Sequence, residues 1–236
     1  MQQISYSSLI LSFIPALAVL VYFILHSIEY KTTLYAMARM ILQLVMIGYL
    51  LVYVFETEES WIVISVLSVM LIAAGWIALR TVPHLQKKLF FHALGSIALG
   101  GGFTLVIITQ AVLDIEPWFA PDYLIPLAGM IFANAMIAIS LSAERLYKEL
   151  KMKQTYETAF NDALFASLIP ITNSLFAVGL VSLPGMMTGQ ILSGVSPLIA
   201  ARYQMMVMAM IFGASGLSVI LFLQLTKKVF MEPSSR

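Results

Sequence analysis

The chain contains no cysteine among its 236 residues, and only 11% of them are charged. The lack of cysteine excludes disulfides, iron–sulfur clusters and thiolate metal sites. The lack of charge excludes a soluble globular enzyme, because an average soluble domain carries about 25% charged residues. Thirteen basic and twelve acidic residues give a net charge of +1, so no excess of charge points to a nucleic acid as partner.

Hydrophobic residues make up 61% of the chain, and its mean hydropathy is +0.94. A helix needs about 20 mostly apolar residues to cross a bilayer, and charged residues collect at the bilayer edges. The charge-poor stretches therefore predict an all-α integral membrane protein with about seven transmembrane helices. We place these at Leu9–Leu25, Tyr35–Phe55, Trp61–Leu79, Phe90–Leu113, Tyr123–Ser142, Ala163–Ser182 and Tyr203–Thr226. No basic segment precedes the first of them, so we expect a retained helix rather than a signal peptide.

The loop charges orient these spans. Acidic residues alone occupy the loops after the second and fourth spans, at Glu56, Glu58, Glu59, Asp114, Glu116 and Asp122. Twelve of the thirteen basic residues lie on the opposite side, at Lys31, Arg39, Arg80, Lys87, Lys88, Arg145, Lys148, Lys151, Lys153, Lys227, Lys228 and Arg236. Because basic residues favour the cytoplasmic side, we expect the N-terminus outside and the C-terminus in the cytoplasm.

We expect one transmembrane domain over residues 1–236, with two segments of special interest. The polar stretch 143–162 predicts a cytoplasmic helical connection that continues the fifth span, either as a solvated extension or as a docking surface for a partner. The stretch 183–197 contains three glycines, two prolines and no charge. Irregular backbone at membrane depth is tolerated where it is buried or lines water, so this stretch is either re-entrant or an external loop.

Several polar or soft side chains fall at or near membrane depth. Each needs a partner there, so it either ties helices together or lines a substrate pathway. The pathway candidates are Arg39, Gln43, Asn134, Asn173, Met186, Met187, Gln190 and Gln204. Met186 and Met187 are the candidate metal ligands, because thioethers bind soft metals, although methionine also fills irregular gaps. We interpret the methionines at 205, 206, 208 and 210 as packing.

Motifs for chemistry within the chain are lacking. No segment has the P-loop pattern that cradles nucleotide phosphates. The three histidines, at positions 26, 84 and 92, do not have the spacing of a metal site. We therefore expect a chain that is not an enzyme.

A family resemblance covers most of the chain. Its most specific part is SLPGMMTGQILSG at Ser182–Gly194, followed by SPLIAARYQ, with further matches in IPLAGMIFANAM at Ile125–Met136 and LIPITNS at Leu168–Ser174. These segments resemble the Fet-type (FetB-like) permeases, the membrane subunits of ABC transporters linked to iron export. Plant relatives in that family are associated with aluminium tolerance, so the resemblance does not fix one substrate.

The resemblance implies a multi-pass permease of the inner or plasma membrane that forms a homodimer and exports iron or another metal by alternating access. It implies that ATP and Mg are bound by a separate cytosolic ABC ATPase and that this chain binds no cofactor. Glu144, Arg145 and Glu157 are the implied ATPase-coupling residues. The stretch from Glu157 to Pro170 is shorter than in relatives, which leaves an alternative: a diverged, non-transporting membrane scaffold or regulatory subunit.

Overall fold

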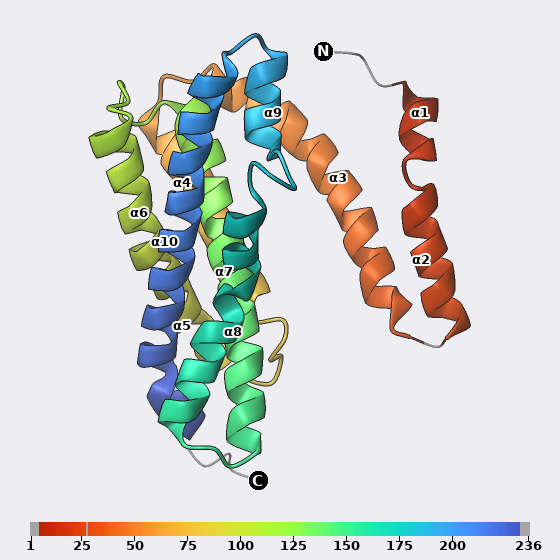
Figure 1. Ribbon diagram of the computed structural model, residues 1–236, viewed down its shortest axis with the longest axis vertical. Coiled ribbons are helices and arrows are strands. Elements are labelled where there is room, and N and C mark those ends of the chain that lie inside the picture. The colour runs from red at the N-terminus through yellow and green to blue at the C-terminus, as the bar shows by residue number, and fades with distance from the viewer. Residues whose placement is uncertain (1–4, 27, 232–236) are drawn as a thin grey trace. The chain divides into compact units, whose positions relative to one another are not determined.

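The computed structural model describes residues 5–26 and 28–231, and every regular element in these ranges is a helix. Arg236, one of the basic residues used to orient the spans, lies outside the described residues. Contacts divide the chain after Thr57 into two compact units, which are described separately below (Figure 1).

The first unit consists of a helical hairpin. Its first arm is broken into α1 (Tyr6–Leu11) and α2 (Ile14–Leu25), and its second arm is α3 (Tyr30–Phe55). Ser5 caps α1, and a proline in the first turn of α2 follows the break. Within this unit most apolar side chains are exposed. Such an apolar surface suits contact with lipid or with other helices.

The second unit is a helical bundle. Along the chain it contains α4 (Ser60–Ala78), α5 (Gln86–Ser96), η1 (Ile97–Gly101), α6 (Gly102–Val106), η2 (Ile107–Val112), α7 (Pro121–Lys151), α8 (Tyr156–Ala177), α9 (Gly185–Leu192) and α10 (Pro197–Met231). The elements from α5 to η2 form one continuous rod in which η1 and η2 are π-helical. The long helices α7 and α10 run side by side through its centre (Figure 1).

The core of this unit lies between α7, α10 and the helices around them. About half of the most apolar stretch of each central helix is buried, 50% for α7 and 56% for α10, against 22% for α4. Small residues such as Ala128, Ala135 and Ala214 alternate with Ile131 and Phe222, and all of these side chains are fully buried. Small residues let the helix backbones approach closely. Close van der Waals packing of this kind holds helices together in a membrane, where lipid tails are as apolar as the side chains and the hydrophobic effect gives no preference for helix association.

Two glycines of η1 allow the closest of these approaches. A Cβ atom on Gly100 would lie 2.7 Å from the backbone nitrogen of Ser218 in α10. A Cβ atom on Gly101 would lie 2.8 Å from the Ile131 side chain in α7. These two positions therefore require glycine for close helix packing, whereas a Cβ atom on Gly95, Gly102, Gly213 or Gly216 would meet nothing within 4 Å.

Within residues 5–26 and 28–231, six helices are long and apolar enough to cross a membrane: Ser7–Leu25, Tyr30–Phe55, Ser60–Ala78, Gln86–Val112, Pro121–Lys151 and Pro197–Met231. They agree with six of the seven expected spans. The remaining expected span, Ala163–Ser182, falls on α8, which is helical over 22 residues but is not among the six. Polar residues such as Glu157 and Asp162 lower the apolarity of α8.

The stretch 143–162 was expected to be one helical connection, and the structure corrects this in part. Helix α7 does continue to Lys151, but the chain then turns at residues 152–155 and α8 begins at Tyr156. Lys153 adopts a left-handed conformation with φ of 61°, which ends α7, and the Thr155 side chain caps α8. The result is a tight helical hairpin.

Tyr156 attaches the start of α8 to the end of α10. Its hydroxyl donates a hydrogen bond to the backbone carbonyl of Leu223, and the Lys227 ammonium lies 5.5 Å from its ring centroid.

Candidate functional site

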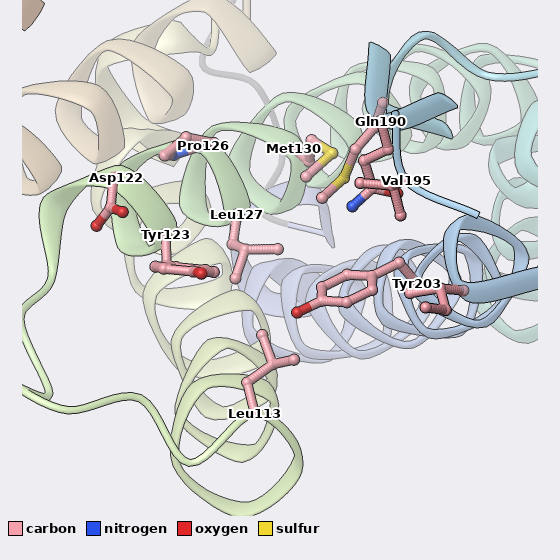
Figure 2. A pocket seen from close by; sticks show the side chains of 11 residues that line it. Leu113, Asp122, Tyr123, Pro126, Leu127, Met130, Gln190, Val195 and Tyr203 are labelled. Atoms are coloured by element: carbon pink, nitrogen blue, oxygen red, sulfur yellow. The ribbon is translucent and has the colours of Figure 1, made fainter. Parts of the chain in front are cut away.

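A cavity of about 340 Å³ opens where the first turns of α7 and α10 meet α9 (Figure 2). We call it the first cavity. Its lining residues are Leu113, Asp122, Tyr123, Pro126, Leu127, Met130, Met186, Gln190, Val195, Ile199 and Tyr203. Most of these side chains are apolar, so the few polar atoms among them determine what the cavity can bind.

The polar atoms of the first cavity are mostly oxygens. Asp122 lies in the first turn of α7, where the helix dipole favours a negative charge. The rings of Tyr123 and Tyr203 extend from α7 and α10 toward each other across the cavity (Figure 2). The Oε1 atom of Gln190 is buried and has no hydrogen-bond partner. One carboxylate, two phenols and an unpaired amide oxygen thus line one space.

Two thioethers join these oxygens, from Met130 of α7 and Met186 of α9. Within residues 5–26 and 28–231, no group of three or more His, Cys, Asp or Glu side chains could hold a metal. A cation in the first cavity would therefore depend on Asp122 together with neutral oxygen and sulfur atoms. Such a mixed ligand set with one formal charge favours weak, exchangeable binding over a resident metal.

A second cavity of about 430 Å³ is lined by other residues of α9 and α10 together with the end of α8. Its lining residues are Leu175, Val178, Gly179, Met187, Ala201, Gln204, Met205, Met208 and Ala209. Unlike the first cavity, it is lined by no carboxylate and no phenol. Gln204 is only 5% exposed, and its Oε1 atom has no hydrogen-bond partner.

A third cavity of about 420 Å³ follows one face of α8 and reaches Phe212 of α10. Asn161, Thr172 and Asn173 provide its polar atoms. Pro170 lies within the same helix without ending it, and the Ser174 hydroxyl donates to the Pro170 carbonyl at 3.0 Å. The third cavity is thus lined by amide and hydroxyl groups from one helix.

The eight predicted pathway residues are distributed over these cavities and beyond them. Met186 and Gln190 line the first cavity, Met187 and Gln204 the second, and Asn173 the third. The predicted metal ligands Met186 and Met187 therefore line different cavities. The structure does not bring the two thioethers together as one metal site.

The other three predicted pathway residues line none of the three cavities. Asn134 donates from Nδ2 to the Met130 carbonyl of its own helix at 2.8 Å. Arg39 and Gln43 lie one turn apart on α3 of the first unit, and both are exposed within that unit.

Sequence reasoning missed four polar or sulfur-bearing residues of the first cavity: Asp122, Tyr123, Met130 and Tyr203. Asp122 was assigned to an acidic loop. The signal for its true position was Pro121, because proline at the first helical position followed by an acidic residue is typical of a helix start.

The predicted coupling residues lie at the α7–α8 hairpin. Glu144 pairs with Lys148 and Arg145 pairs with Glu149, each at 2.6 Å. The Glu149 side chain is 5% exposed, against 49% for Arg145, so this pair is half buried. Glu157 is exposed in the first turn of α8. Glu149 was not predicted from the sequence, because no pattern in the sequence indicates that its side chain is buried.

The six apolar helices of membrane-spanning length among the described residues define a multi-pass α-helical membrane protein. Residues 5–231 match the model of the family described as "Uncharacterised protein family (UPF0014)". The chain belongs to this family. The Fet-type resemblance is thereby confirmed, because a FetB protein is among the relatives.

Three relatives show the range of the family. The chain is 39% identical over 206 residues to "UPF0014 membrane protein slr1647" of Synechocystis, covering 79% of this chain and 78% of that protein. It is 33% identical over 215 residues to "Probable iron export permease protein FetB" of Escherichia coli, covering 85% and 82%. It is 34% identical over 229 residues to "Protein ALUMINUM SENSITIVE 3" of Arabidopsis thaliana, covering 87% and 82%. No solved structure matches the chain.

Proposed function

We propose that this chain is the permease subunit of an ABC transporter that exports iron or another metal species across the inner or plasma membrane. Membership of a membrane protein family and similarity to a probable iron export permease support the proposal. The observation that carries it in the structure is the first cavity, where Asp122 and three neutral oxygen-bearing side chains line one space.

In this proposal α8 is the seventh span. Its 22 residues rise about 33 Å at 1.5 Å per residue, enough for a hydrocarbon layer of about 30 Å. With the N-terminus outside and the C-terminus in the cytoplasm, the orientation that the loop charges favour, the first cavity would lie at the outer end of α7 and α10. The same orientation puts the α7–α8 hairpin at the cytoplasmic end.

The first cavity then acts as the place from which a cation leaves. Carboxylate, phenol and amide oxygens suit hard cations, and a single carboxylate holds such a cation weakly enough to release it. Its transport would follow alternating access in a dimer of this chain. The energy would come from a cytosolic ABC ATPase, which binds ATP and Mg while this chain binds no cofactor. Glu144, Arg145 and Glu157 lie where that partner would contact the hairpin.

Replacing the carboxylate tests the role of the first cavity. In cells that produce this chain together with its ATPase, we expect Asp122→Asn to reduce metal export several-fold, measured as retained iron by elemental analysis. Asp114→Asn is the matched control, because Asp114 lies in the preceding loop and does not line the cavity. Its φ of 48° also suits asparagine. Export by Asp122→Asn that equals that of the control would refute the proposed role.

One observation favours a second candidate, a non-transporting scaffold or regulatory subunit. Only residues 152–155 separate α7 from α8, so the hairpin contains no separate helix for an ATPase to hold. Reconstitution with the cognate ATPase in vesicles separates the two candidates. A transporter is expected to stimulate ATP hydrolysis, and this stimulation should fall when the hairpin charges are removed. A scaffold would bind the ATPase and leave its rate unchanged.

A further inference from the structure

The second cavity differs chemically from the first, and the proposed function does not use it. Three thioethers line it: Met187 from α9, and Met205 and Met208 from α10. Met205 and Met208 are three residues apart, so their side chains share one face of α10. Two further groups on that face, Ala201 and Ala209, are small and leave the space open.

These methionines do not simply fill a gap. The cavity they line has a volume of about 430 Å³ and is not filled by their side chains. Met205 is 65% exposed and Met208 is 8% exposed, so the thioethers extend from the surface of α10 to its buried side. By contrast, Met210 of the same helix is 2% exposed and lines none of the three cavities, as expected for a packing residue.

Gln204 supplies an independent observation. It is 5% exposed, lines the second cavity, and its Oε1 atom is buried with no hydrogen-bond partner. A buried polar atom without a hydrogen-bond partner is rare and requires an explanation. One explanation is that the atom contacts a bound ion. The amide oxygen would give a bound ion a weak contact beside the thioethers, as an axial glutamine does in some copper sites.

We propose that the second cavity binds a soft monovalent metal ion, of the class of Cu(I) and Ag(I), through the thioethers of Met187, Met205 and Met208. Soft thioether ligands select such ions over hard cations. No carboxylate lines the cavity, which disfavours divalent ions because their larger charge would stay uncompensated in an apolar space. This site is distinct from the oxygen-lined first cavity and does not depend on the proposed function.

Silver is a suitable probe because Ag(I) needs no reductant. The full chain, purified in detergent micelles and in chloride-free buffer, is titrated with silver nitrate. Bound silver is measured by elemental analysis after desalting, its affinity by competition with a chelator, and its neighbours by X-ray absorption. We expect one silver ion per chain with sulfur neighbours. We expect the double variant Met205→Leu with Met208→Leu to bind it at least about ten-fold more weakly, the smallest loss typical of an altered metal shell.

The matched control is Met206→Leu with Met210→Leu, which makes the same change on the same helix outside the cavity. It is expected to retain the affinity of the unaltered chain. Should the test double variant unfold, Met187→Leu alone repeats the test from α9, with the same expected weakening. Failure to bind silver, equal losses in test and control, or an absorption spectrum without sulfur neighbours would each overturn the proposal. None of these results depends on metal export through the first cavity, because the assay measures silver binding and not transport.

Discussion

The contact of η1 with α10 gives the sharpest prediction about stability, for the substitution Gly100→Ala. The added Cβ atom would lie 2.7 Å from the Ser218 nitrogen, 2.8 Å from the Ser218 hydroxyl and 3.0 Å from the Leu217 carbonyl carbon. Two of these three neighbours are backbone atoms of a central helix, so no rotamer change can relieve the overlap. Either η1 or α10 must therefore move by several tenths of an ångström.

The magnitude follows from two opposing terms. Overpacking in a close-packed interior costs about 1–3 kcal/mol, and contact with backbone falls toward the upper end of that range. Alanine is favoured over glycine in a helix by up to about 1 kcal/mol. The free energy of unfolding should therefore fall by about 1–2 kcal/mol. Gly102→Ala is the control, because a Cβ atom added at Gly102 would meet nothing within 4 Å and the Gly102 φ of −63° is helical. It should stabilise the protein by about 0.5–1 kcal/mol.

Unfolding by sodium dodecyl sulfate in mixed micelles, followed by circular dichroism, measures both changes. Adding Ser218→Ala to Gly100→Ala removes the hydroxyl contact and leaves the contact with the backbone nitrogen, so it should recover only part of the lost stability. The reasoning is refuted if Gly100→Ala and Gly102→Ala shift the unfolding midpoint in the same direction. Full recovery by Ser218→Ala would show that the side chain alone, rather than the backbone, limits the approach.

Four further substitutions test the α7–α8 hairpin with the same unfolding assay. Arg145→Met should destabilise by about 2–3 kcal/mol because it leaves the buried Glu149 charge unpaired, whereas Glu149→Gln should cost less than about 1 kcal/mol since Arg145 stays solvated; equal effects would contradict this asymmetry. Tyr156→Phe should cost about 1 kcal/mol by leaving the Leu223 carbonyl without its donor, and no change would show that the bond contributes nothing. Lys153→Gly should stabilise by up to about 1 kcal/mol by relieving the left-handed backbone, and a loss of stability would contradict that reading.

Much of the helix layout could be predicted from the distribution of charge. The expected span Trp61–Leu79 differs from α4 by one residue at each end. The fifth span, Tyr123–Ser142, lies within α7, which runs from Pro121 to Lys151, and the predicted polar continuation is helical as far as Lys151. Its polar extension is helical because its charges pair four residues apart on the helix surface. An apolar stretch predicts the part of a helix that lies inside a membrane, but it does not predict where the helix ends outside the membrane.

The arrangement of the candidate residues was harder to predict. Met186 and Met187 were paired because the stretch around them was interpreted as an irregular turn. In the structure they belong to α9, and adjacent helical residues point about 100° apart, so the two thioethers face different cavities. Gln190, four residues after Met186, lines the same cavity as Met186. Knowledge that the segment is helical would have separated the pair.

The glycine and proline content of residues 183–197 now has a physical reason. Helix α9 has only eight residues, is preceded by Pro184 and is followed by Gly194 with φ of 93°. Both ends must turn sharply for α9 to pack against α10, and only glycine adopts the left-handed turn without strain. Because Met186 lines the first cavity and Met187 the second, a rigid movement of α9 relative to α10 would shift a lining residue of both cavities. The shape of an oxygen-lined space and that of a sulfur-lined space therefore depend on the same two turns.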